Sequence, residues 1–97
     1  MANQQRLNVL IVDREEESQL HLKALLSEQG YGVTCLSEPL RAPEEIRQNR
    51  FQMVMLDVSP GSGSAEALAA IRAFDRDLCV IATTGVASVE MAAEAMK

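Results

Sequence analysis

Four short apolar runs alternate along this chain with segments in which apolar residues recur at helical spacing. The runs have the length and composition of buried strands, and they occupy residues 7–12, 31–37, 51–58 and 78–84. The periodic segments predict helices around residues 20–26, 42–50 and 65–74, with a fourth that begins near Ser88. Glycine and proline separate these elements: Gly30 ends the first helix, Pro39 ends the second strand, and Pro43 lies near the start of the second helix.

This regular alternation predicts an α/β fold. Strands that alternate with helices form a doubly wound parallel sheet, with right-handed crossovers and helices on both faces. Ligands of such sheets bind at the carboxyl ends of the strands, near the point where the strand order reverses. Asp13, Asp57 and Thr84 all lie at the carboxyl ends of predicted strands. We therefore expect these three side chains to meet in one crevice.

Two carboxylates and a hydroxyl in one crevice favour phosphate chemistry. Neighbouring carboxylates repel each other, and a hard cation such as Mg²⁺ relieves that repulsion. An aspartate such as Asp57 can attack a phosphoryl group and form an aspartyl-phosphate, and Thr84 could donate a hydrogen bond to it. Each acid taken alone would be an ordinary cap or turn residue. The hypothesis rests on the recurrence of such residues at the same end of successive strands.

Composition narrows the classes of function. The chain has 97 residues, enough for one domain, and its 47% hydrophobic content is typical of a folded globular protein. A formal net charge of −5 argues against direct contact with nucleic acid. The sequence contains neither an apolar run long enough to cross a membrane nor a signal peptide, so we expect a cytoplasmic protein.

The cysteines and the single histidine predict no further chemistry. Cys35 and Cys79 lie far apart, each in an apolar segment, without the spacing of a metal site. We expect both thiols to be reduced and buried in the core. His21 lies on the predicted first helix, with no Ser, Cys or second His placed to work with it. We expect it to be solvated or partly packed.

Three stretches of the chain resemble the receiver domain of two-component response regulators: "VLIVDREEE", "FQMVMLDVSPGSGSAEALAAIR" and "VIATTGVASVEMAAEAMK". The last stretch is similar to receivers joined to sigma-54-dependent (NtrC-like) transcriptional activators. The resemblance covers residues 1–97 as one domain and implies a flavodoxin-like sheet with strand order 2-1-3-4. A full receiver continues through a fifth strand and a fifth helix. We therefore expect a C-terminally truncated receiver, with an output domain beyond residue 97 of the longer protein.

The resemblance also implies a role for each candidate residue. Asp57 is the phosphoacceptor that takes a phosphoryl group from a histidine kinase, and Thr84 is the hydroxyl that moves toward the phosphate. Asp13, Asp57 and the backbone carbonyl of Ser59 are the ligands of Mg²⁺. Such a domain is a switch rather than an enzyme, although it catalyses its own phosphorylation and dephosphorylation.

Arg14 departs from the family pattern, because it stands where a second metal-binding acid is expected. In one interpretation its guanidinium is a built-in cation, since arginine is permanently charged and can fork onto a carboxylate. Mg²⁺ affinity would then fall, and the domain would be a pseudo-receiver that acts through protein contacts without phosphate. In the other interpretation Arg14 points to solvent and pairs with Glu15, Glu16 or Glu17, one of which could replace the missing ligand.

Two further departures concern a loop and a sheet edge. The loop "DVSPGSGSAE" is one residue shorter than the usual family loop, and we interpret it as a flexible turn because it lacks the Lys of a P-loop. Without a fifth strand, the fourth strand would be an exposed edge, which invites pairing or swapping. We therefore expect this chain to form a homodimer or a swapped assembly.

An enzyme on the same architecture is the remaining alternative, because a fold does not fix a function. A phosphatase with an aspartyl nucleophile would need another acid two residues after Asp57, where this chain has Ser59. A flavin carrier would need aromatic stacking that a 3% aromatic content scarcely provides.

Overall fold

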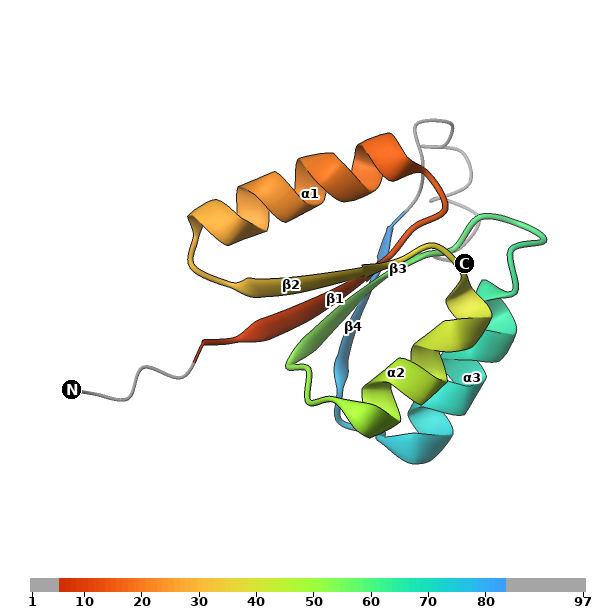
Figure 1. Cartoon of the computed structure of the whole chain (residues 1–97). Coiled ribbons are helices and arrows are strands. Elements are labelled where there is room, and N and C mark those ends of the chain that lie inside the picture. Colours follow the sequence, from red (N-terminus) through yellow and green to blue (C-terminus); the bar gives the residue numbers. More distant parts are fainter. Residues whose placement is uncertain (1–5, 84–97) are drawn as a thin grey trace.

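The computed structural model describes residues 6–83, which form a four-stranded parallel sheet with helices on both faces (Figure 1). The strands, in sheet order β2-β1-β3-β4, are β1 (Asn8–Val12), β2 (Gly32–Leu36), β3 (Met53–Asp57) and β4 (Cys79–Thr83). The helices are α1 (Glu16–Glu28), α2 (Ala42–Gln48) and α3 (Ser64–Phe74), and a short 3-10 helix, Pro39–Arg41, precedes α2. The predicted fold class and strand order are confirmed.

The observed strands are shorter than the apolar runs predicted. Phe51 and Leu78 belong to predicted strands, but each lies just before the strand that follows it. Both side chains are nonetheless buried in the core. The predicted strands were therefore too long because these two apolar residues are buried, although a loop residue can pack in the core without pairing in the sheet. Thr84 and the helix expected from Ser88 lie outside the described residues.

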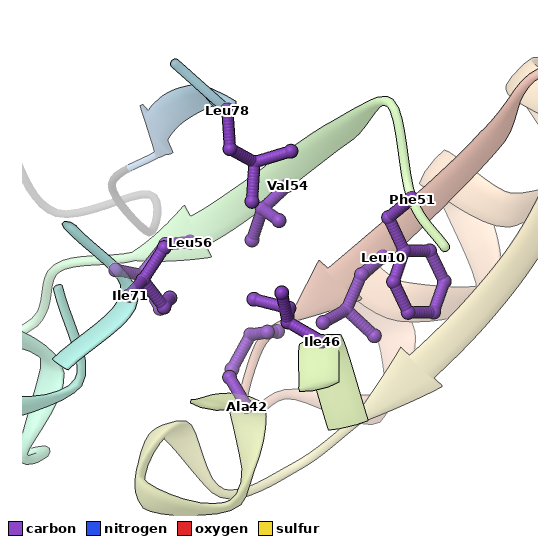
Figure 2. Packing of buried hydrophobic residues seen from close by; sticks show 9 residues of the cluster. Leu10, Ala42, Ile46, Phe51, Val54, Leu56, Ile71 and Leu78 are labelled. Carbon is purple, nitrogen blue, oxygen red and sulfur yellow. The ribbon is translucent and has the colours of Figure 1, made fainter. Parts of the chain in front are cut away.

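The main hydrophobic core lies between the sheet and the pair α2 and α3 (Figure 2). Parallel register places Leu10 of β1 beside Val54 of β3, and alternate side chains of both strands point to this face. The remaining buried members come from the strands, the helices and the loops before β3 and β4: Val12, Leu56, Ala42, Ile46, Ile71, Phe51 and Leu78. This core fixes β1 and β3, the two strands that carry the acids of the predicted site.

The opposite face of the sheet is covered less completely. Helix α1 packs against β1 and β2, as Figure 1 shows, yet none of its residues is buried. Leu20 is 60% exposed and Leu25 is 49% exposed, whereas Leu22 and Leu26 are half-buried. Only part of the apolar stripe read from the sequence therefore faces the sheet. Among residues 6–83, no helix is long and apolar enough to span a membrane.

The cysteines show the consequence of this uneven cover. Cys79 pairs with Met53 in the sheet and alternates with Val80, which packs against the main core. Its side chain therefore belongs to the α1 face, where it is exposed. The prediction that Cys79 is buried in the core is wrong, because α1 packs over β1 and β2 rather than β4. Cys35 is only half-buried, so the predicted core position is wrong for this cysteine as well. His21 is exposed, as expected.

Candidate functional site

The ends of β1 and β3 bring Asp13 and Asp57 to the same edge of the sheet. The two strands are parallel neighbours, and Val12 lies opposite Leu56, so the residue after each is an aspartate at the same level. Both acids are buried, with exposed fractions of 7% for Asp13 and 5% for Asp57. The predicted convergence of these two carboxylates is confirmed.

The Asp57 carboxylate lies close enough to Asp13 to affect the ionisation of Asp13. The pKa of Asp13 is raised above its ordinary value of 3.8, chiefly because burial disfavours the charged form. The negative charges of Asp57 and Glu15 raise the pKa of Asp13 further, whereas a hydrogen bond from the backbone of Glu15 lowers it. A cation between the acids would relieve this unfavourable charge.

Local hydrogen bonds fix one oxygen of each carboxylate. Asp57 Oδ1 accepts the backbone N–H of Ser59 at 3.2 Å and its hydroxyl at 2.8 Å. Asp13 Oδ1 accepts the backbone N–H of Glu15 at 2.9 Å. Within residues 6–83, the second oxygen of each carboxylate accepts no hydrogen bond. The loops therefore orient both acids and leave one oxygen of each for a ligand.

Gln19 of α1 holds this edge of the sheet together. Its Nε2 donates to the backbone carbonyl of Asp13 at 2.6 Å and to that of Leu36 at 3.0 Å. The amide thus links the end of β1 to the end of β2, and the Leu36 carbonyl also accepts the N–H of Asp13 at 3.0 Å. We did not anticipate this residue from the sequence, because its second partner is 17 residues away.

The loop after Asp57 is a hydrogen-bonded turn at residues 59–62. The Ser59 carbonyl accepts the backbone N–H of Ser62 at 3.3 Å and the Ser62 hydroxyl at 2.7 Å. Pro60 and Gly61 occupy the central positions, and Gly61 has φ +75°, which are features of a type II turn. The predicted turn is therefore present, and its hydrogen bonds engage the carbonyl that we predicted to bind the metal.

Arg14 is exposed and lines a cavity of about 260 Å³ beside this turn, together with Glu38, Leu40 and Ser62. In the part of the chain that the structure describes, hydrogen bonds to the carboxylate groups of Asp13 and Asp57 come from the loops and none comes from Arg14. The role of its guanidinium as a built-in cation stays a prediction.

The chemistry of the donors fits a divalent cation through the two carboxylates. Asp13 and Asp57 each offer one oxygen, and a hard cation such as Mg²⁺ prefers oxygen ligands. The Ser59 carbonyl fits less well as it stands, since both of its acceptor positions are engaged by Ser62. Among residues 6–83, no cluster of three His, Cys, Asp or Glu side chains could hold a metal.

The comparison with protein families decides the identity of the fold. Residues 9–97 match the family described as the response regulator receiver domain. The chain belongs to this family. Asp13 and Asp57 thus lie at the strand ends of a receiver domain, as the sequence motifs predicted. Thr84, the third predicted site residue, lies outside the described residues.

Relatives of this receiver domain include transcriptional regulators. The transcriptional regulatory protein ZraR of Klebsiella oxytoca is 31% identical over 94 residues, which cover 96% of this chain and 21% of ZraR. ZraR of Escherichia coli K12 is 33% identical over 92 residues, which cover 94% of this chain and 21% of ZraR. The receiver domain therefore spans about a fifth of the length of these relatives.

A solved structure with the same fold is the response regulator TrrA of Thermotoga maritima in complex with Mg²⁺-BeF. It has a TM-score of 0.76 and 26% identity, and the match covers 88% of this receiver domain and 75% of that chain. A chain from the complex of the histidine kinase ThkA with TrrA has a TM-score of 0.74 and 26% identity, over 87% of this chain and 73% of that one.

Proposed function

We propose that this receiver domain accepts a phosphoryl group on Asp57 from a histidine kinase and thereby regulates an output domain. The observation that carries the proposal is the buried Asp57 carboxylate at the end of β3, held by Ser59 through one oxygen and adjacent to Asp13. The family match and the TrrA complex with a kinase support it. ZraR supports a transcriptional output, of the sigma-54-dependent type that the C-terminal motif resembles. Cytoplasmic location follows from this function as a further prediction.

In the proposed reaction, Asp57 Oδ2 attacks the phosphorus of the phosphohistidine. The new O–P bond forms as the P–N bond breaks, and the departing imidazole of the kinase keeps the electron pair. Ser59 holds Oδ1 from two directions, so it orients the attacking oxygen. Mg²⁺, held by Asp13 and Asp57, would neutralise the negative charge that gathers on the transferring group. Thr84 is proposed to bind a phosphoryl oxygen.

A second candidate function is a pseudo-receiver that signals through protein contacts without phosphate. Arg14 favours the pseudo-receiver, because an acid at this position would have given the site a third carboxylate. Residues 6–83 contain no cluster of three His, Cys, Asp or Glu side chains that could hold a metal. Substitution of Arg14 separates the two functions without changing the phosphoacceptor.

Intact-mass spectrometry with a small phosphodonor such as acetyl phosphate tests the proposed function. We expect the 97-residue chain to gain one phosphoryl group when Mg²⁺ is present. Asp57→Asn should abolish this gain, whereas the control Asp75→Asn, which changes an acid after α3, should keep it. Absence of the adduct at every Mg²⁺ concentration would support the pseudo-receiver. An equal gain without Mg²⁺ would contradict the role proposed for the metal in the transfer.

Arg14→Asp then tests the departure from the family pattern. We expect this variant to bind Mg²⁺ more tightly and to gain phosphate faster, since it supplies the missing carboxylate. Arg41→Asp changes the net charge equally, at an exposed side chain at the end of the 3-10 helix, and should do neither. Equal behaviour of the two variants would show that only net charge matters, and that position 14 has no special role.

A further inference from the structure

The side chain of Ser62 donates a hydrogen bond to the backbone carbonyl of Ser59, which the resemblance to receivers predicts to be a third ligand of Mg²⁺. The Ser62 hydroxyl lies 2.7 Å from this carbonyl oxygen. The backbone N–H of Ser62 reaches the same oxygen at 3.3 Å. A carbonyl oxygen has two lone pairs, so these two donors leave no free acceptor position for a cation.

We propose that Ser62 is an internal competitor of Mg²⁺: its hydroxyl and its backbone N–H together fill the Ser59 carbonyl, and one of these two hydrogen bonds must be lost before that carbonyl can bind the metal. Ser62 is therefore a positioning residue that sets the metal affinity of the site without binding the metal itself. The inference rests on the proposed function in one respect, namely the identity of Ser59 as a metal ligand.

The geometry of the 59–62 turn explains why the competition is built into this loop. The short loop places Pro60 directly after Ser59, and Gly61 follows with φ +75°. Proline and glycine at these two positions direct the N–H of Ser62 back onto the Ser59 carbonyl. The carbonyl is thus held within the turn while Asp57 Oδ1 is held by Ser59 at 2.8 Å.

A second hydrogen bond orients the Ser62 hydroxyl. Its oxygen accepts the backbone N–H of Ser64 at 3.3 Å, at the start of α3. With an acceptor position used by Ser64, the single hydroxyl hydrogen is directed to Ser59. Ser62 therefore stabilises the start of α3 and occupies the Ser59 carbonyl at the same time. Removal of its hydroxyl should affect stability and metal affinity in opposite directions.

The test is a titration of the full 97-residue chain with Mg²⁺ alone, followed by backbone amide chemical shifts in NMR spectra. Ser62→Ala should bind Mg²⁺ about two- to tenfold more tightly than the unaltered chain, which is the range expected when one competing hydrogen bond is lost. The same variant should unfold at a lower urea concentration. Ser62→Thr keeps the hydroxyl and should restore the original affinity.

A glycine pair gives an independent test through the backbone. Gly61→Ala disfavours the positive φ of the turn without a steric clash, since no atom lies within 4 Å of the added Cβ. It should loosen the N–H contact of Ser62 with Ser59 and also tighten Mg²⁺ binding. Gly30→Ala is the matched control, because Gly30 has φ +92° and equally open surroundings at the end of α1. It should leave Mg²⁺ affinity unchanged.

Unchanged or weaker Mg²⁺ binding by Ser62→Ala would overturn the proposal, as would a failure of Ser62→Thr to restore the affinity. Loss of this inference leaves the proposed function intact if Asp57 is still phosphorylated in the presence of Mg²⁺. Conversely, tighter Mg²⁺ binding by Ser62→Ala supports the competition even if no phosphodonor ever modifies Asp57. The experiments therefore distinguish failure of the competition from failure of the proposed function.

Discussion

Replacement of Gln19 by methionine should destabilise the domain far more than the same replacement of Gln48. Gln19 Nε2 donates two hydrogen bonds to backbone carbonyls, whereas Gln48 Nε2 donates one exposed bond to Glu44, at 2.7 Å. Both residues lie in helices, and methionine has nearly the same helix propensity and length as glutamine. The pair therefore isolates the hydrogen bonds of Gln19 from its helical context.

The magnitude follows from the number of bonds lost. A typical intramolecular hydrogen bond contributes about 0.5–1.5 kcal/mol, so the loss of two predicts a decrease of about 1–3 kcal/mol in the free energy of unfolding. Leu36 retains one donor, the backbone N–H of Asp13, at 3.0 Å. The Asp13 carbonyl has no other donor within residues 6–83 and should carry most of the cost. Gln48→Met should change the free energy of unfolding by less than about 0.5 kcal/mol, as exposed substitutions usually do.

Urea unfolding followed by far-ultraviolet circular dichroism measures the free energy of unfolding of both variants. The slope of each transition verifies that the surface area exposed on unfolding is unchanged. Gln19→Glu adds a check on the chemistry. At neutral pH a carboxylate cannot donate to two carbonyls, so this variant should be at least as unstable as Gln19→Met. If Gln19→Met and Gln48→Met unfold within about 0.5 kcal/mol of each other, the bridge between β1 and β2 makes no net contribution, and the argument is refuted.

Three further predictions concern charge and exposure. In metal-free buffer, Asp13→Asn should raise the urea midpoint at neutral pH, because the raised pKa of Asp13 means that its ionised form destabilises the folded chain. The gain in stability should disappear as the pH falls through this raised pKa to 3.8, and a gain that persists in acid would contradict an origin in the charge of Asp13. Cys79, which is exposed, should be alkylated before Cys35, since burial raises the pKa of the Cys35 thiol and lowers its thiolate fraction. Peptide mass mapping at mildly alkaline pH measures both alkylation rates, and equal rates would refute the predicted order. Light scattering should show a dimer of the unaltered chain, and a stable monomer at high concentration would exclude the predicted assembly. Ile81→Lys should weaken the dimer, because Ile81 is 41% exposed on β4.

Local sequence patterns determined the elements and the place of the acids. Continuous apolar runs predicted β1 and β3 as strands buried on both faces, and an aspartate at the end of each placed Asp13 and Asp57 at one edge of a parallel sheet. This inference needs only the periodicity of the chain and the rule that parallel strands share their direction. The strand order came from the resemblance to receivers, because periodicity does not say which strands are neighbours.

Tertiary structure decided which apolar positions are covered. Cys79 and Leu20 lie in apolar patterns as regular as those of the core, yet both are exposed. Cys79 is exposed because α1 packs over β1 and β2 rather than β4, and Leu20 lies on α1 itself, on the part of its apolar stripe that does not face the sheet. The hydrogen bonds of the site also needed the fold, since Gln19 joins two strand ends and Ser62 turns back onto Ser59. A sequence pattern sets the direction of each side chain relative to its own element. What that side chain contacts depends on the position of the other elements, which only the packed chain defines.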